Sequence, residues 1–312
     1  MVMQKVAVIG ECMVELQRRD GHLVEAFGGD TLNTALYLSR LTHQQGLETY
    51  YVTGLGKDSF SRDMLAAWEA EQINTSLVTL SDTKKPGLYL IETDQTGERT
   101  FHYWRNDAAA RYWLEEGDVT QISASLSEFS AIYVSGISLA ILSEQNQNRL
   151  FKILEQCKTN GAKVLFDNNY RPHLWQAVSD AQKAYARMLA LTDIALLTFD
   201  DEVMLYGDSD VETCIQRTQQ AGVTEIVIKR GADDCLIVQG ESQVSVPATR
   251  VDRVVDTTAA GDSFSAGYLA QRLTGGSAEA SAQSGHQLAG TVIQHPGAII
   301  PRDVMPAIKL NQ

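Results

Sequence analysis

Cysteine and proline are both scarce in this sequence, with four and six copies among 312 residues. The four cysteines are scattered along the chain, and no two of them have the C-x-x-C spacing of a zinc or redox motif. We therefore expect neither a disulfide framework nor a structural zinc site. This use of cysteine favours a reducing compartment, the cytoplasm.

Long apolar runs are absent as well. No stretch of about 18 apolar residues, the length that spans a membrane, occurs in the sequence. The opening residues, MVMQKVAVIGECMVEL, contain only a short apolar run, which acids follow, and no cleavage site of small residues. We therefore expect no signal peptide and no association with a membrane.

Positive charge is in short supply. The chain has 26 Lys and Arg against 39 Asp and Glu, a formal net charge of −13. A surface this acidic repels phosphate backbones, so nucleic acid is not expected as a partner. A small anionic substrate would need its own local cluster of basic side chains.

Short apolar strands that alternate with helical segments make up most of the chain. KVAVIG (5–10) is a continuous apolar run of the kind that is buried on both faces of a parallel sheet. Strands separated by helices predict an α/β fold, with a mostly parallel sheet and helices on both faces. Further strands are expected at 49–56, 130–136, 162–169, 193–198 and 225–231.

Two segments depart from this alternation. Residues 87–105 contain two strand-like runs joined by the turn sequence DQTG, and residues 235–248 show the same pattern, so both predict β-hairpins. From Asp262 to about His295 the sequence predicts a pair of helices that is broken at 274–277. One α/β domain over 1–312 that carries a small β appendage accounts for the whole pattern.

The stretch DTTAAGDSFSAG (256–267) is the strongest chemical signal. Ala259, Ala260 and Gly261 leave the backbone bare, and their N–H groups would lie at the N-terminus of the next helix, a ready anion site. The helix dipole would keep Asp262 in its charged form. It could then take a proton from a hydroxyl that attacks a phosphorus atom. An N-cap aspartate after a tight turn is the alternative interpretation.

The longer string resembles the C-terminal signature of the ribokinase-like (PfkB) sugar kinases, although Ala259 stands where that family usually has glycine. GGDTLNTA (28–35) is similar to the family's substrate loop, and GLGKDSF (54–60) to another of its motifs. The resemblance covers nearly the whole chain. It implies a ribokinase-like α/β kinase that uses ATP and Mg²⁺, with a small β-sheet lid formed by about 12–26 and 87–112.

Within the family, TGERTFHYWRN, FDNNYRP and KRGADDC resemble the bacterial branch that phosphorylates 2-keto-3-deoxygluconate. This implies transfer of the ATP γ-phosphate to the 6-hydroxyl of 2-dehydro-3-deoxy-D-gluconate, which gives 2-dehydro-3-deoxy-6-phospho-D-gluconate. The alternatives are a related kinase of fructose, ribose or tagatose 6-phosphate, and a non-catalytic protein that binds sugar acids.

The residues themselves favour an acidic sugar. Arg105 and Arg171 each follow a strand-like run, and the planar fork of arginine can bind a carboxylate through two hydrogen bonds. Surface ion pairs are the alternative interpretation of both residues.

The resemblance also implies a role for each matching position. Asp262 would be the general base, and Ala259, Ala260 and Gly261 the anion hole. The sugar would contact Gly28, Gly29, Asp30, Asn33, Tyr89, Tyr103, Arg105 and Arg171. The ATP side would be lined by Asn169, Lys229, Gly231, Asp234 and Thr257.

One departure concerns the metal. The family often has N-x-x-E after a middle strand, whereas this chain has Thr198 and Asp201, with Glu202 beside them. We therefore expect Mg²⁺ to come with ATP and to be held through water, without a direct protein ligand. Unpaired edges of the lid strands predict a homodimer or a higher assembly through the lid.

Overall fold

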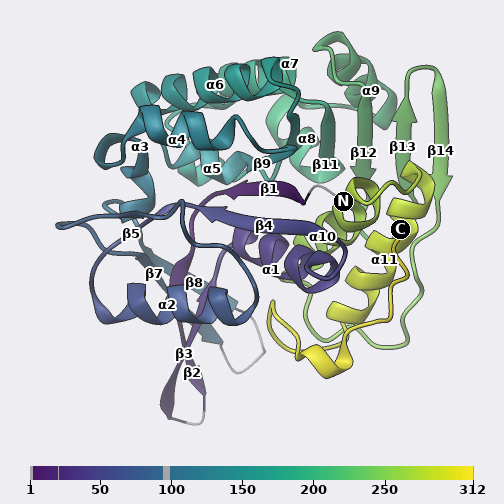
Figure 1. The fold of residues 1–312 in the computed structure, drawn as a ribbon. Coiled ribbons are helices and arrows are strands. Elements are labelled where there is room, and N and C mark those ends of the chain that lie inside the picture. The colour runs from purple at the N-terminus through teal and green to yellow at the C-terminus, as the bar shows by residue number, and fades with distance from the viewer. Residues whose placement is uncertain (1–2, 20, 94–98, 312) are drawn as a thin grey trace.

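Two β-sheets form the framework of the protein in this computed structural model, which describes residues 3–19, 21–93 and 99–311 (Figure 1). The strands are β1 (Gln4–Ile9), β2 (Met13–Arg19), β3 (His22–Gly28), β4 (Leu47–Val52), β5 (Gly54–Leu55), β6 (Thr79–Leu80), β7 (Gly87–Thr93), β8 (Arg99–Trp104), β9 (Ala131–Ser135), β10 (Lys163–Asp167), β11 (Ile194–Thr198), β12 (Glu225–Lys229), β13 (Cys235–Gln239) and β14 (Ser242–Val246). The α-helices are α1 (Asp30–Thr42), α2 (Ser59–Ala70), α3 (Trp113–Glu116), α4 (Val119–Leu126), α5 (Gly136–Ala140), α6 (Glu144–Thr159), α7 (Val178–Leu191), α8 (Phe199–Tyr206), α9 (Val211–Gln220), α10 (Ala260–Leu273) and α11 (Ala278–Val292). Short 3₁₀ turns lie at Ala109–Arg111, Pro172–Leu174 and Arg302–Val304.

The large sheet has eight strands in the order β14-β13-β12-β11-β10-β9-β1-β4. The strands from β12 to β4 run parallel, β13 is antiparallel to them, and the edge strand β14 pairs antiparallel with β13 and so runs in their direction. Successive residues of a strand point to opposite faces, so β1 sends Ala7 and Ile9 into one core and Val6 and Val8 into the other. The predicted α/β class, mostly parallel with helices on both faces, is confirmed.

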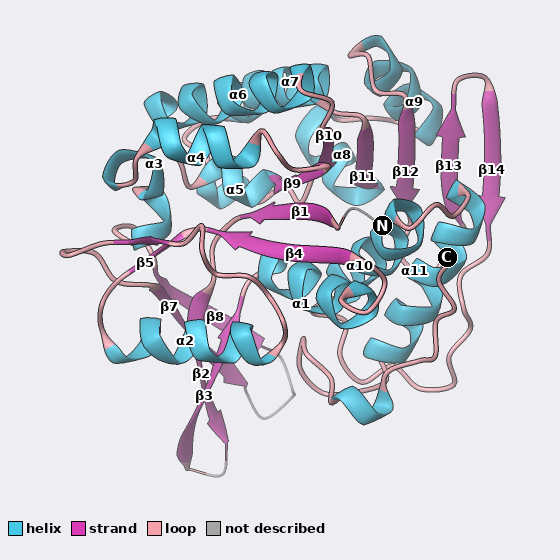
Figure 2. Ribbon diagram, in the orientation of Figure 1, coloured by secondary structure: helices cyan, strands magenta, loops and turns pink. Residues whose placement is uncertain are grey.

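Helices cover both faces of this sheet, as Figure 2 shows. One core packs α4, α6, α7 and α9 against it, with Phe151, Tyr185 and Ile215 among the buried side chains. The other core packs α1, α2, α10 and α11, and Trp68 and Tyr268 are buried there. Parallel strands buried on both faces leave their carboxyl ends as the edge where a ligand can bind.

The small sheet has the order β3-β2-β7-β8 and lies beside the carboxyl ends of β1 and β9 (Figure 1). Its β7–β8 pair is antiparallel, with Tyr89 opposite Tyr103, as the hairpin prediction required. The predicted turn DQTG lies outside the described residues. The sheet ends at Trp104, so the last part of the segment 87–112 forms a loop and a 3₁₀ turn instead of strand.

Within the described ranges, no helix has both the length and the apolar character needed to cross a membrane. The four cysteines, Cys12, Cys157, Cys214 and Cys235, are all buried as free thiols.

Candidate active site

A cavity of about 180 Å³ lies between the small sheet and the carboxyl end of the large sheet. Asp30 and Asn33 reach it from the first turn of α1, and Asp262 from the first turn of α10. The eight residues that the sequence predicts for sugar binding all line this one cavity. They are Gly28, Gly29, Asp30, Asn33, Tyr89, Tyr103, Arg105 and Arg171.

The glycine pair before α1 is required by close packing. Gly29 is the N-cap of α1, and a Cβ atom there would lie 2.3 Å from the carbonyl oxygen of Glu11. At Gly28 a Cβ atom would lie 2.1 Å from the hydroxyl of Tyr89. A larger residue at Gly29 would push the backbone of Glu11 away from α1, and one at Gly28 would displace the Tyr89 side chain from the cavity wall.

Asp262 belongs to a buried polar network. Asn33 Nδ2 donates to Asp262 Oδ2 at 2.8 Å, and Asn169 Nδ2 donates to Asp30 Oδ2 at 2.7 Å. The Ser135 hydroxyl also donates to Asp30. Burial and the charge of Asp30 raise the pKa of Asp262 to about 8, while the Asn33 hydrogen bond opposes that rise. Burial likewise raises the pKa of Asp30.

This corrects the expectation that the helix N-terminus keeps Asp262 charged. Burial of the carboxyl group and the nearby charges of Asp30 and Asp167 raise its pKa. Asp262 therefore holds its proton more tightly than an exposed aspartate does. A carboxylate with such a raised pKa is a stronger base once it is deprotonated, which suits it to accept a proton from a hydroxyl.

The predicted anion hole is also changed in detail. Helix α10 begins at Ala260, with Ala259 as its N-cap. Ala259 is buried and is not part of a cavity wall, and the Ala260 N–H donates to the carbonyl of Thr257 at 3.1 Å. Gly261 lines the larger cavity described below and is the remaining candidate donor of the three.

Arg105 has a partner that the sequence did not reveal. Its guanidinium forms an ion pair with Glu11, and both side chains are buried. The Nε atom of Arg105 and the Oε1 atom of Glu11 are buried without a hydrogen-bond partner. Leaving such atoms unpaired costs about 1–3 kcal/mol each, so this pair is prepared to bond a ligand in the cavity.

Arg171 is more exposed than Arg105. Its Nη1 atom donates to the carbonyl of Tyr170 at 2.8 Å and lies 3.5 Å from Asp201 Oδ1. Nearby, the ring of His173 stacks on Tyr103 with centroids 6.1 Å apart, which joins the loop after β10 to the small sheet. Both arginines line the cavity, Arg105 as a buried side chain just after β8 and Arg171 as a more exposed one in the loop after β10.

A second cavity, of about 620 Å³, lies along the carboxyl ends of β10, β11 and β12. Four of the five residues predicted for ATP line it: Asn169, Lys229, Gly231 and Thr257. The prediction for Asp234 is not supported, because Asp234 lies outside this lining and accepts a hydrogen bond from Ser245 at 2.8 Å. His286 from α11 lies in the cavity wall.

Lys229 is held at the end of β12 by a buried ion pair. Its Nζ atom lies 2.7 Å from Asp167 Oδ2 and 3.3 Å from the Ser265 hydroxyl. Neither Asp167 nor Glu11 was predicted as a site residue, although both stand at or just after the carboxyl end of a central strand. The position at the end of a central strand was the available signal, and Asp167 also stands within FDNNYRP, one of the stretches that carry the resemblance.

The two cavities meet at Asp262. Four residues line both of them: Asn169, Arg171, Thr258 and Asp262. A small ligand in one cavity and a larger ligand in the other would therefore approach each other beside the Asp262 carboxylate. This geometry suits the transfer of a group between two bound molecules, with a base at the point of contact.

The family model of the pfkB family carbohydrate kinases matches residues 3–305, and the chain belongs to this family. The ribokinase-like assignment from sequence is thereby confirmed. A solved structure described as a ribokinase II from Escherichia coli, in complex with ATP and Mg²⁺, has the same fold. Its TM-score is 0.81 at 22% identity, with 95% of this chain and 94% of that chain covered.

Two relatives are more specific. The 2-dehydro-3-deoxygluconokinase of Dickeya dadantii is 57% identical over 310 residues, which cover 98% of this chain and all of that protein. The 2-dehydro-3-deoxygluconokinase of Escherichia coli K12 is 55% identical over 307 residues, 97% of this chain and 99% of that protein.

Proposed function

We propose that this carbohydrate kinase transfers the γ-phosphate of ATP to the 6-hydroxyl of 2-dehydro-3-deoxy-D-gluconate. The product is 2-dehydro-3-deoxy-6-phospho-D-gluconate. The observation that carries the proposal is a small cavity with two arginines that opens beside Asp262 onto a larger cavity. The printed names of the two relatives support the same substrate.

The small cavity fits a sugar acid. Arg105 and Arg171 supply positive charge and planar hydrogen-bonding groups for a carboxylate. At the other side, Asn33, Asp30 and the glycine pair would contact hydroxyl groups, and they direct one hydroxyl towards Asp262. Because Glu11 balances the charge of Arg105, the pocket binds the acid through directed hydrogen bonds more than through net charge.

The larger cavity fits a nucleotide. Its volume of about 620 Å³ lies within the range of sites for ligands of this size. Lys229, Gly231 and the N-terminus of α10 would contact the phosphates. Bound Mg²⁺ would neutralise phosphate charge, and Asp201, which already accepts from the Tyr170 N–H at 3.0 Å, would reach it through water.

The chemistry then follows from placement. Asp262 removes the proton of the 6-hydroxyl as that oxygen attacks the phosphorus, and Asn33 keeps the carboxylate aimed at it. The Gly261 N–H and the Lys229 ammonium stabilise the charge of the phosphoryl group in transit. The free thiols and the need for ATP support the cytoplasm as the place where this occurs.

Analysis of the product tests the site of transfer. With Mg-ATP and 2-dehydro-3-deoxy-D-gluconate, the phosphorus NMR spectrum of the product should show coupling to the two protons on C6. A phosphate coupled to a single methine proton would place the transfer at a secondary hydroxyl. That result would contradict the proposed placement of the sugar.

We further propose that two chains associate through the small sheet. Its edge strands β3 and β8 expose Leu23, Phe101 and Trp104, the last with 60% of its surface accessible. Apolar side chains on unpaired edge strands favour pairing with a second copy.

Replacing Trp104 with glutamate should therefore shift the chain towards monomer, because a charge would be buried at the contact. Sedimentation velocity would measure the mass against 34.3 kDa for one chain. Met204→Glu, at an exposed methionine of α8, is the matched control and should leave the assembly unchanged. A wild-type protein that sediments as a monomer at micromolar concentration would contradict the proposal.

A further inference from the structure

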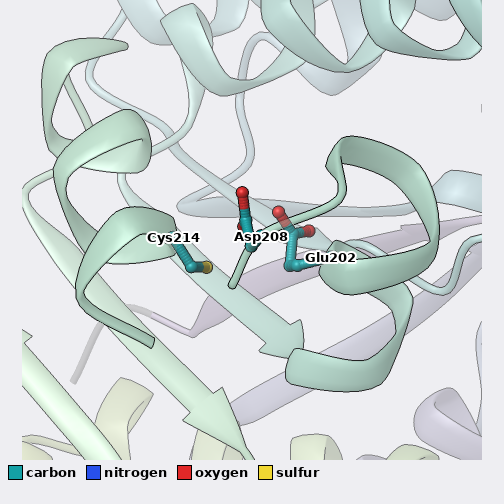
Figure 3. Close-up of side chains that lie close together, drawn as sticks. All are labelled: Glu202, Asp208 and Cys214. Carbon is teal, nitrogen blue, oxygen red and sulfur yellow. The ribbon is translucent and has the colours of Figure 1, made fainter. Parts of the chain in front are cut away.

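A buried cluster of ionisable side chains is formed by α8, α9 and the loop between them. Figure 3 shows Glu202, Asp208 and Cys214 close together, with their ligand atoms within 4.8 Å of one another. Arg217 bonds both acids: its Nη2 atom lies 2.5 Å from Glu202 Oε2, and its Nη1 atom donates to Asp208. Its guanidinium also lies 3.8 Å from the centroid of the Tyr206 ring.

These contacts describe an ion-pair cluster in place of a metal centre. The arginine already neutralises much of the charge of the two carboxylates, and burial raises the pKa of the Cys214 thiol to about 12. A metal ion would need the acids free and the thiol deprotonated. We therefore interpret the cluster as a structural element that fixes neighbouring residues.

The second carboxylate oxygen of Glu202 bonds Asn168, the neighbour of the cavity residue Asn169. Glu202 Oε1 accepts from Asn168 Nδ2 at 2.8 Å, and the same amide donates to the carbonyl of Thr198 at 3.0 Å. Asn168 Oδ1 in turn accepts from the N–H groups of Thr198 and Asn169, each at 2.9 Å. Every hydrogen-bonding position of this buried amide is thus filled, which fixes its orientation.

The residue that Asn168 holds is Asn169, and its backbone is strained. Asn169 has φ 28°, one of two non-glycine residues with positive φ in the described part of the chain. Such a conformation costs about 1–3 kcal/mol and persists only where neighbouring contacts impose it. In this conformation Asn169 lines both cavities, and its Nδ2 atom donates to Asp30 at 2.7 Å.

We propose that Glu202, itself fixed by Arg217, is a positioning residue for the loop 168–171. The sequence of contacts runs from Arg217 through Glu202 and Asn168 to the strained Asn169 beside Asp30. Glu202 touches neither cavity, so its effect on the reaction passes through Asn168. The inference rests on the proposed function only in that the loop carries Asn169 and Arg171 to the reacting molecules.

Three variants test this role. Glu202→Met keeps the length of the side chain but cannot accept from Asn168, and kcat/KM for the sugar should fall at least about tenfold as the loop shifts. Glu202→Gln keeps an acceptor, so its kcat/KM should stay within about threefold of the wild-type value. Asp208→Leu is the matched control. It also removes one carboxylate from Arg217 but does not contact Asn168, so it should lower the melting temperature and leave kcat/KM within about threefold.

The same contact can be broken from its other side if Glu202→Met fails to fold. Asn168→Asp places a carboxylate oxygen against Glu202 Oε1 in place of the amide donor, and should lose at least about tenfold in kcat/KM. Adding Glu202→Gln to Asn168→Asp should recover part of that loss, because the glutamine amide can donate back.

Three results would overturn the proposal. One is that Glu202→Met lowers only the melting temperature. The others are that Asp208→Leu or Glu202→Gln loses as much activity as Glu202→Met. These ratios are measured with whichever sugar the wild-type enzyme phosphorylates, so failure of the proposed substrate is seen separately in the wild type. A crystal structure of Glu202→Met gives a readout without turnover. In that structure Asn169 should leave the positive φ region. An unchanged φ would contradict the proposed series of contacts from Glu202 to Asn169.

Discussion

Replacing Asp262 with asparagine is expected to reduce kcat by about 10²–10⁴-fold, the usual effect of removing a general base. The amide has the same shape as the carboxylate, and its oxygen can still accept from Asn33, so the fold and the cavity should be retained. Steady-state kinetics with Mg-ATP and the sugar acid would measure the loss, with circular dichroism to check folding. A variant that keeps more than a tenth of the wild-type kcat would reduce Asp262 to a structural residue of the first turn of α10.

A matched control separates loss of the base from loss of a half-buried, hydrogen-bonded carboxylate elsewhere in the chain. Asp193→Asn removes a carboxylate that bonds Lys158 at 2.7 Å and the Val164 N–H at 2.8 Å, outside both cavities. It should affect thermal stability and leave kcat unchanged.

The pH profile gives a second signature of the same base. Burial and the charge of Asp30 raise the pKa of Asp262 to about 8, so the free enzyme holds this proton at neutral pH. Because only the deprotonated form can accept the proton of the hydroxyl, kcat/KM should rise with pH up to about 8 and then level off. The residual activity of Asp262→Asn should lack this ascending limb.

Replacing Arg105 with lysine is expected to raise KM for the sugar acid about 10- to 100-fold, the range for losing a hydrogen bond between charged groups. Lysine can keep the ion pair with the buried Glu11, but it offers a point charge where arginine offers a planar fork. Arg105 lines the small cavity and is not part of the larger one, so KM for ATP should change by less than about threefold.

The control for this second prediction is Arg272→Lys. Arg272, like Arg105, binds a buried carboxylate, here with Nη2 at 2.8 Å and Nε at 3.1 Å from Glu225 Oε2, but it lies in neither cavity wall. It should lower the melting temperature without changing either KM. Equal increases in KM for the sugar acid and for ATP in Arg105→Lys would mean that Arg105 does not meet the carboxylate.

Much of the fold could be predicted because its signals are local. The run KVAVI predicts a strand from its own residues, because they are mostly apolar on both faces. Strand β1 includes the whole run. The hairpins at 87–105 and 235–248 were equally visible, because strand patterns on both sides of a short turn define them. The N-terminus of α10 was predicted near Asp262 and lies at Ala260, a small shift that nevertheless moves Asp262 into the first turn.

The partners of the site residues could not be predicted in the same way. Glu11 and Arg105 are 94 residues apart, and Asp167 and Lys229 are 62 apart, so only the folded sheet brings each pair together. The raised pKa of Asp262 has the same origin, because it depends on burial and on Asp30 from another helix. Motifs indicated which residues line the two cavities, whereas the charges that balance and orient them come from tertiary packing.

ADP release with Mg-ATP across a panel of acceptors is the most direct test of the proposed activity. The panel comprises 2-dehydro-3-deoxy-D-gluconate, its galactonate epimer, gluconate, fructose and ribose. Turnover should be concentrated on the keto-deoxy acids, with kcat/KM at least about 10²-fold above that for fructose or ribose, because two arginines line the small cavity. Equal or faster turnover of fructose or ribose would contradict the sugar-acid assignment, and silence on every acceptor would contradict the kinase itself.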